Sequence, residues 1–164
     1  MPQIDEPRFR ETLGRLLREL LQGPAPDASF MLNRGDRGML ASLAQLSAAQ
    51  ASASPDGRAS VAAHVDHLRY GLSLLNRWAG GDDPWGGMDF SASWTRVHVT
   101  EPQWRELREA LASETTAWSQ AIDQPREWTR ESLTETIASV AHLAYHLGAI
   151  RQIQPAAGGP PAKD

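Results

Sequence analysis

Helical periodicity in four separate segments is the feature that most restricts the fold of this chain. Apolar residues recur there at three- and four-residue steps, and stretches rich in glycine, proline and polar residues separate the segments. The segments are roughly 7–22, 60–78, 100–122 and 129–153. Each carries one apolar stripe that it has to bury against a neighbour. The sequence therefore predicts an all-α protein built as a four-helix bundle.

Residues with known end preferences support these boundaries. Ser60 and Thr100 stand where a side-chain oxygen can cap a helix N-terminus, and Gln103 completes the capping-box pattern T-E-P-Q. Gly23 and Pro24 end the first segment. A short helix is expected at Met39–Leu46 within the long connection between the first two segments. This long connection argues against a plain up-down-up-down order.

The aromatic stretch MDFSASWTRVHVT, at 88–100, is expected to be an ordered connection rather than a strand, because no second strand pattern lies near enough to pair with it. The chain has 164 residues, which suits one domain with a sizeable core. We expect this domain to span 1–154 and the segment 155–164 to be a disordered tail, since it is rich in glycine and proline.

Composition excludes several kinds of chemistry. The chain has no cysteine, which rules out disulfides, a protein thiol nucleophile and cysteine-ligated metal. Its single lysine, Lys163, lies in the predicted tail, and neither a phosphate-binding loop nor a dinucleotide fingerprint is present. A net charge of −4 without a dense basic run argues against a nucleic-acid partner. No apolar run approaches the ~20 residues of a membrane span, and the first residues lack a signal-peptide pattern, so we expect a cytoplasmic protein without a membrane partner.

Histidine is the residue type that clusters. His142 and His146 form an H-x-x-x-H pair, whose spacing directs both imidazoles to one side of a helix. The second helical segment adds His64 and His67, from which a facing ligand could come. The spacing is therefore consistent with a metal site between two helices, and equally with a hydrogen-bonded core pair or with carboxylate and water partners for these rings.

The chemistry of such a site is restricted further. Leu143 follows His142, so the H-E-x-x-H pattern of zinc proteases is absent, and no carboxylate residue lies between Glu135 and Asp164. This predicts a mononuclear site rich in nitrogen ligands. Three imidazoles with an open position suit zinc, nickel or a similar divalent ion.

Helical spacing alone does not choose between His64 and His67 as the third ligand. Two further polar residues have simpler interpretations: His98 is expected at the surface of a connection, and Asp66 is expected to be a surface carboxylate. Trp85 and Trp94 could either cover the metal pocket or cover a dimer face.

The segments SVAAHVDHLRYGLSLLNRW and HLAYHLGAIRQI together resemble the DinB-like superfamily of metal-binding four-helix bundles. The resemblance covers roughly 9–153. It implies a histidine triad of metal ligands, namely His67, His142 and His146. His64 would then lie beside the ligands or line the pocket. The resemblance also implies frequent homodimers.

Members of that superfamily include thiol-dependent S-transferases, so the first functional hypothesis is a metal-dependent transferase acting with a low-molecular-weight thiol as the small-molecule partner. If this thiol is anionic, an arginine could hold it. The simpler interpretation of each candidate arginine is a solvated position on a helix. The candidates are Arg69, Arg77 and Arg151. A metal-dependent hydrolase using bound hydroxide is the second hypothesis. A non-catalytic, stress-related binding or structural module is the third.

Overall fold

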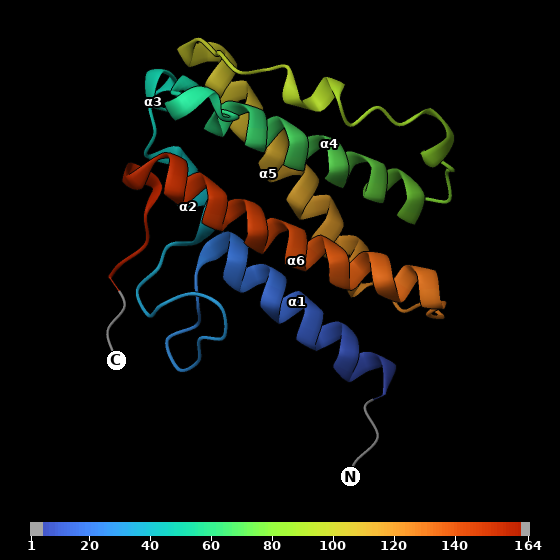
Figure 1. Cartoon of the computed structure of the whole chain (residues 1–164). Coiled ribbons are helices and arrows are strands. Elements are labelled where there is room, and N and C mark those ends of the chain that lie inside the picture. The colour runs from blue at the N-terminus through green and yellow to red at the C-terminus, as the bar shows by residue number, and fades with distance from the viewer. Residues whose placement is uncertain (1–4, 162–164) are drawn as a thin grey trace.

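The computed structural model describes residues 5–161, and these form an all-helical protein without a β-strand (Figure 1). The all-α class predicted from the sequence is therefore confirmed. The helices are α1 (Glu6–Gln22), α2 (Gly38–Ala44), α3 (Ala48–Ser52), α4 (Val61–Ala79), α5 (Glu101–Asp123) and α6 (Arg130–Ile153). Four 3-10 turns join them, namely η1 (Pro55–Gly57), η2 (Trp85–Gly87), η3 (Ala92–Trp94) and η4 (Pro155–Ala157).

The long helices begin at the capping residues expected from the sequence. Ser60 Oγ accepts a hydrogen bond from the backbone N–H of Ala63, and Thr100 with Gln103 forms a complete capping box. A second capping box, Ser47 with Gln50, starts α3 within a stretch expected to be a loop. With only five residues, α3 is too short to show an apolar period in the sequence.

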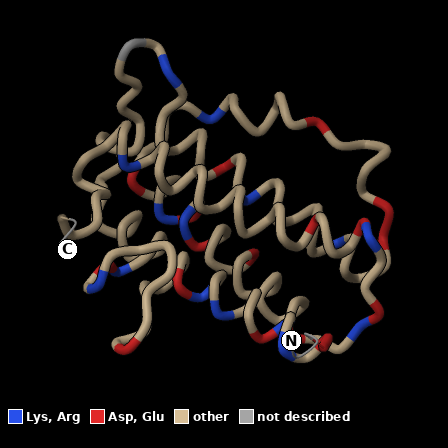
Figure 2. The backbone as a smooth tube through the Cα atoms, turned by 60° about the horizontal axis from the view of Figure 1, so that its bottom comes forward, with Lys and Arg blue, Asp and Glu red and all other residues tan. Residues whose placement is uncertain are grey.

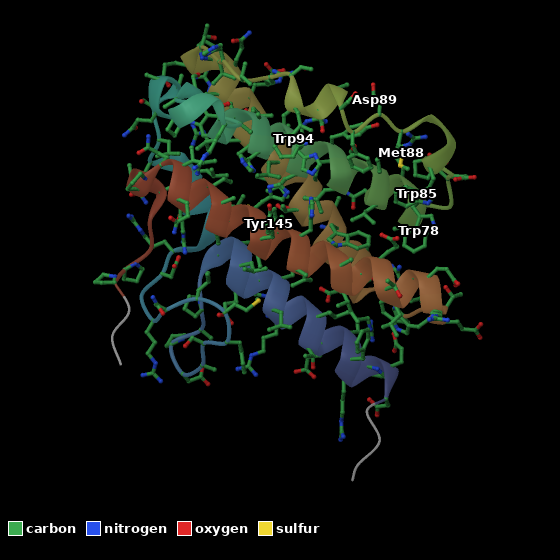
Figure 3. All side chains as sticks on the ribbon, viewed as in Figure 1. Trp78, Trp85, Met88, Asp89, Trp94 and Tyr145 are labelled. Atoms are coloured by element: carbon green, nitrogen blue, oxygen red, sulfur yellow. The ribbon has the colours of Figure 1, made fainter. Side chains whose placement is uncertain are left out.

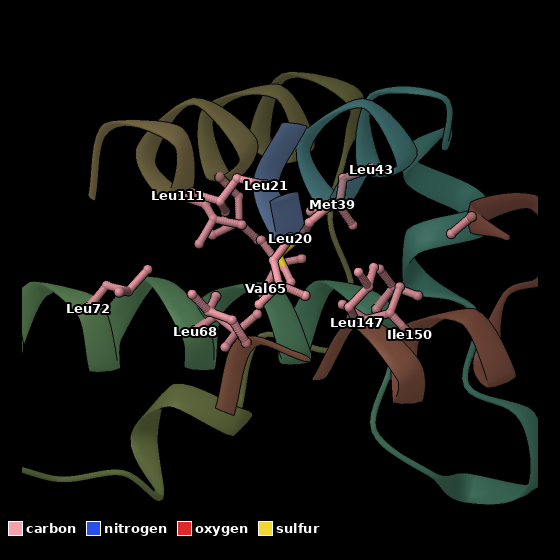
Figure 4. Packing of buried hydrophobic residues seen from close by; sticks show 14 of the residues in the cluster. Leu20, Leu21, Met39, Leu43, Val65, Leu68, Leu72, Leu111, Leu147 and Ile150 are labelled. Carbon is pink, nitrogen blue, oxygen red and sulfur yellow. The ribbon is translucent and has the colours of Figure 1, made fainter. Parts of the chain in front are cut away.

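The four long helices pack around a shared core (Figure 1). α4 packs against α5 and α6, and α1 packs against the same two helices from the other side. Leucines from all of them, together with Met39 of α2, interdigitate in the centre (Figure 4). Two tryptophans of α5, Trp104 and Trp118, are fully buried, and each indole N–H donates a hydrogen bond inside the protein.

The first two turns of α4 are buried on all sides. Every residue from 61 to 68 is buried, polar ones included. The reason is that α3, α5 and α6 cover part of this surface and the connection 80–100 covers the rest, running along α4 in Figure 1. α4 is thus a central helix of the domain.

The connection 80–100 is held to neighbouring helices by polar contacts. Arg96 pairs with Asp66 of α4 at 3.1 Å, and the backbone N–H of Asp89 donates to the hydroxyl of Tyr70. Further along, the N–H of Val99 donates to Ser52 of α3. An ordered connection without strand structure, as predicted, is confirmed.

Two buried carboxylates organise the earlier connection, 23–37. Glu19 of α1 accepts hydrogen bonds from three successive backbone N–H groups, those of 30–32. Burial alone would raise the pKa of Glu19, but these three donors and nearby Arg15 hold it below its usual range. Asp36 pairs with Arg151 of α6 at 2.9 Å and is almost fully buried.

The start of the C-terminal segment is ordered, in contrast to the tail expected from 155 onward. η4 follows α6 directly, and Ala157 is fully buried against the core. Arg151 also donates to the carbonyl of Ala157. Glycine and proline therefore indicate the end of α6 but not the loss of order. Residues 162–164 lie outside the described part of the chain.

Basic and acidic residues are interspersed along the helices, and neither sign gathers on one element (Figure 2). Within residues 5–161, no helix combines the length and the apolar character that crossing a bilayer requires.

Candidate metal centre

Three histidines from two helices converge near the middle of the fold. His67 lies on α4, and His142 and His146 lie one turn apart on α6. One ring nitrogen of each lies within 4.8 Å of the corresponding nitrogens of the other two. The Nε2 atoms of His67 and His142 are 3.1 Å apart. The structure thus brings together the three residues that the resemblance selects, and they could hold a metal ion.

Ser93 orients the imidazole of His67. The hydroxyl of Ser93 donates its proton to the carbonyl of Phe90 at 2.7 Å, so its oxygen is left to accept a hydrogen bond from His67 Nδ1 at 3.0 Å. With its proton on Nδ1, His67 presents the Nε2 lone pair towards His142. A metal-ligating histidine is commonly held by a hydrogen bond at its other nitrogen, as here.

His64 contacts His146 and stands outside the triad. Its Nδ1 is 2.7 Å from Nδ1 of His146, so one of these nitrogens carries the shared proton. When His146 is the donor, its Nε2 is free to bind a metal. The sequence left His64 either beside the ligands or lining the pocket, and the first of these positions is the one observed.

Two aromatic side chains, Trp94 and Tyr145, contact the histidines. Trp94 of η3, labelled in Figure 3, stacks on the ring of His67, with centroids 4.3 Å apart, and meets His64 edge-on. Of the two roles left open for Trp94, covering the site is therefore the one observed. Tyr145 lies edge-on to His146 from α6 and is largely exposed.

Burial keeps the histidines neutral. Loss of hydration lowers the pKa of His67 to about 4, and the neighbouring rings of His142 and His64 contribute further. Burial likewise lowers the pKa of His146 to about 3, again with a contribution from nearby histidines. The pKa values of His64 and His142 are also lowered by burial. Near neutral pH, the rings therefore offer lone pairs rather than positive charges, as metal ligation requires.

The triad is accessible from one side. His67 and His146 are buried, whereas His142 is exposed. A ligand can therefore approach across His142. The donor set, three neutral imidazoles with one solvent-facing side, fits a divalent ion that keeps an open coordination position.

Asp66 does not lie at the surface, so the interpretation of it as a solvated carboxylate is wrong. Its side chain is 8% exposed and accepts bonds from Arg69 and Arg96. The connection covers the face of α4 that the helical wheel assigns to solvent, which is the reason for the error. Because both carboxylate oxygens of Asp66 are engaged by arginines, it is not placed as a general base for the triad.

The arginines considered for an anionic cosubstrate are also in ion pairs. Arg69 pairs with Asp66, Arg77 with Asp82, and Arg151 with Asp36. His98 is exposed in the connection, as expected. Sequence reasoning missed Ser93, because a lone serine in a connection has no periodicity that would single it out.

Comparison with known proteins finds no match: no family model, curated protein or solved structure is similar to this chain. The histidine cluster is therefore the feature that carries the functional proposal.

Proposed function

We propose that this chain is a DinB-like four-helix-bundle protein that binds a divalent metal ion, zinc or nickel, through His67, His142 and His146. The proposed activity is that of a metal-dependent transferase, which joins a low-molecular-weight thiol to an electrophilic acceptor. The observation that carries the proposal is the approach of three ring nitrogens, from α4 and α6, to within 4.8 Å of one another. The ring of four long helices around one core is the second support.

A bound divalent ion would supply positive charge, which lowers the pKa of an incoming thiol and favours the thiolate. The chain itself supplies neutral imidazole ligands, and the positive charge of the ion is therefore not cancelled. Ser93 and His64 hold the rings of His67 and His146 in orientation, and Trp94 keeps water from the face of His67 that it covers. The exposed side of His142 leaves an approach for the two reactants.

The proposed transfer requires no oxidant or reductant. The thiolate sulfur forms a bond to an electrophilic carbon of the acceptor, a leaving group departs with its electron pair, and the thiol proton passes to solvent. The sulfur has to come from the cosubstrate, because the chain has no cysteine.

Metal analysis of protein purified without a histidine tag tests the site. We expect about one ion per chain in the wild type, loss of the ion in His67→Ala, and retention in the control His98→Ala, whose imidazole is exposed in the connection. Stoichiometric metal in His67→Ala would contradict the ligand assignment. Metal-free wild-type protein would favour a non-catalytic module.

Thermal-shift measurements with a panel of thiols test the activity class. The metal-loaded wild type should be stabilised by its cosubstrate thiol, since ligands that bind the folded state raise its stability. The metal-free His67→Ala variant should show no such shift. Stabilisation by no thiol would count against the transferase and leave the hydrolase as the alternative.

Homodimer formation is part of the same proposal. Two large apolar side chains of α6 are exposed, Ile137 at 47% and Tyr145 at 70%, and each would gain from burial against a second copy. Sedimentation should give twice the mass of one chain, and Tyr145→Arg should shift the protein towards monomer. A monomeric wild type would contradict this part of the proposal.

A further inference from the structure

An apolar pocket adjoins the histidine triad. It has a volume of about 400 Å³ and opens between α4, α6 and the connection 80–100, with His67 and His142 in its wall. That volume lies within the range of small-molecule sites, roughly 300–1,000 Å³. A molecule in this pocket would therefore have one end against the proposed metal ligands.

The residues that line the pocket favour a neutral, apolar ligand. The surface of the pocket is mostly apolar, and its lining includes Leu72 and Leu75 of α4, Leu143 of α6, and the aromatic rings of Trp85 and Phe90. Among the described residues that line the pocket, Glu135 is the one acidic side chain, and no arginine or lysine accompanies it. Away from the histidines, an anionic group would thus meet a carboxylate and no basic side chain, whereas an apolar body would gain from leaving water.

Gly71 forms part of the pocket wall at a point where the backbone does not require glycine. It lies within α4, one turn after His67, and it is not among the glycines with positive φ. A Cβ atom at this position would meet only the ring of Phe90, at 4.0 Å. Glycine within a helix costs about 1 kcal/mol relative to alanine. What glycine provides here is the space that a side chain would take from the pocket.

We propose that this pocket binds the uncharged, apolar body of an organic substrate, aromatic or branched aliphatic, with its reacting end towards His67 and His142. Gly71 sets the size of the body that the pocket admits. The identification of this ligand as the acceptor of the transfer rests on the proposed function, whereas its binding to the pocket does not. The anionic parts of a thiol cosubstrate lie outside this pocket.

Two fluorescent probes with the same aromatic skeleton test the charge selection. N-phenylnaphthylamine is neutral, and anilinonaphthalenesulfonate carries an added sulfonate. We expect the wild type to bind the neutral probe about tenfold or more tightly than the anionic one. Glu135→Gln should reduce the ratio of the two affinities, because removing the carboxylate tightens binding of the anionic probe and leaves binding of the neutral probe unchanged. Equal or tighter binding of the sulfonate by the wild type, or no binding of the neutral probe, would overturn the proposal.

Gly71 substitutions test the location. Gly71→Ala should weaken binding of the neutral probe moderately, and Gly71→Leu should weaken it about tenfold or more, because the new side chain occupies the pocket. Gly148→Leu is the matched control, since a Cβ at this exposed glycine of α6 has nothing within 4 Å. Its affinity should equal that of the wild type. Circular dichroism and thermal unfolding check that every variant is folded.

Wild-type affinity in a folded Gly71→Leu protein would overturn the proposal. So would an equal loss of affinity in Gly71→Leu and Gly148→Leu. Metal content, measured on the same samples, should stay unchanged in all three variants. If the protein binds the neutral probe as described but holds no metal, the proposed function is contradicted and this inference stands. If the protein holds metal and responds to thiols but binds no probe, this inference is contradicted and the proposed function stands.

Discussion

At the residue scale, the candidate site depends on the partner of each buried imidazole. Ser93 accepts from His67, and His64 shares a proton with His146. These contacts decide which nitrogen of each ring is free. The H-x-x-x-H pair and the two histidines of α4 were recognisable from helical spacing. Ser93 and the stacked Trp94 were not, because contacts from an irregular connection leave no periodic signal.

Removing the Ser93 hydroxyl should weaken metal binding without removing a ligand. We expect Ser93→Ala to lower the affinity for zinc by about 10–100-fold, since the ring of His67 loses the bond that orients it. Thr95→Ala is the control, because this exposed hydroxyl binds only the carbonyl of Ala92. Competition with a metal-binding dye measures both. Unchanged affinity in Ser93→Ala would show that the hydrogen bond does not position His67.

Acid should destabilise the metal-free protein. The pKa values of His67 and His146 fall from 6.5 in the reference state to about 4 and about 3 in the fold. The unfolded chain therefore binds more protons than the folded one below about pH 6.5, and stability decreases as the pH falls from there. Above that pH the contribution is fully present. Urea unfolding of chelator-treated protein between about pH 7 and pH 5 measures the slope.

His146→Gln supplies the comparison for this titration, because glutamine does not titrate in that range. Its stability should decrease less steeply on acidification than that of the wild type. An identical slope in the two proteins would show that His146 does not keep its lowered pKa in the fold.

At the scale of elements, the long helices were predictable, whereas the short helix α3 and the paths of the connections were not. Apolar stripes and capping residues located α1, α4, α5 and α6 from the sequence. α3 and the 3-10 turns are too short for a period to be visible. The path of the connection 80–100 depends on distant contacts, such as Arg96 with Asp66, which local sequence does not encode.

Glu19 gives a test of how one helix holds a connection. Glu19→Gln should destabilise the protein by about 1–3 kcal/mol, because the amide removes the negative charge of the acceptor and replaces Oε2 with a donor facing the N–H of Phe30. Glu11→Gln, an exposed position on the same helix, should change stability little. Urea unfolding compares the two variants. Equal, small effects would mean that the contacts of Glu19 with 30–32 contribute little net stability.

At the scale of the whole molecule, one buried ion pair joins three parts of the chain. Asp36 belongs to the first connection and Arg151 to the last turn of α6, and Arg151 also reaches Ala157. The sequence predicted neither this pair nor the ordered start of the C-terminal segment, because both depend on residues more than a hundred positions apart. Arg151 looked like an ordinary solvated helix residue.

Removing only the cation of this ion pair should lower the stability of the fold. We expect Arg151→Met to lower the free energy of unfolding by about 3 kcal/mol, since it leaves the buried Asp36 carboxylate without its cation. Adding Asp36→Asn removes that charge, so the double variant should be more stable than Arg151→Met alone. Thermal or urea unfolding of the set measures the coupling. A double variant less stable than the single one would contradict this account.

The proposed metal ligands lie on helices, whereas part of the pocket wall lies on a connection, and this separation matters for engineering. The three histidines lie on α4 and α6, whereas Trp85 and Phe90 belong to a connection that is held by the backbone N–H of Asp89, bonded to Tyr70, and by the Arg96–Asp66 pair. That segment is thus an exchangeable cassette. A library randomised at 85–90 would vary one wall of the pocket and leave the ligand-bearing helices and their core intact, so new ligand preferences could be selected without redesigning the scaffold.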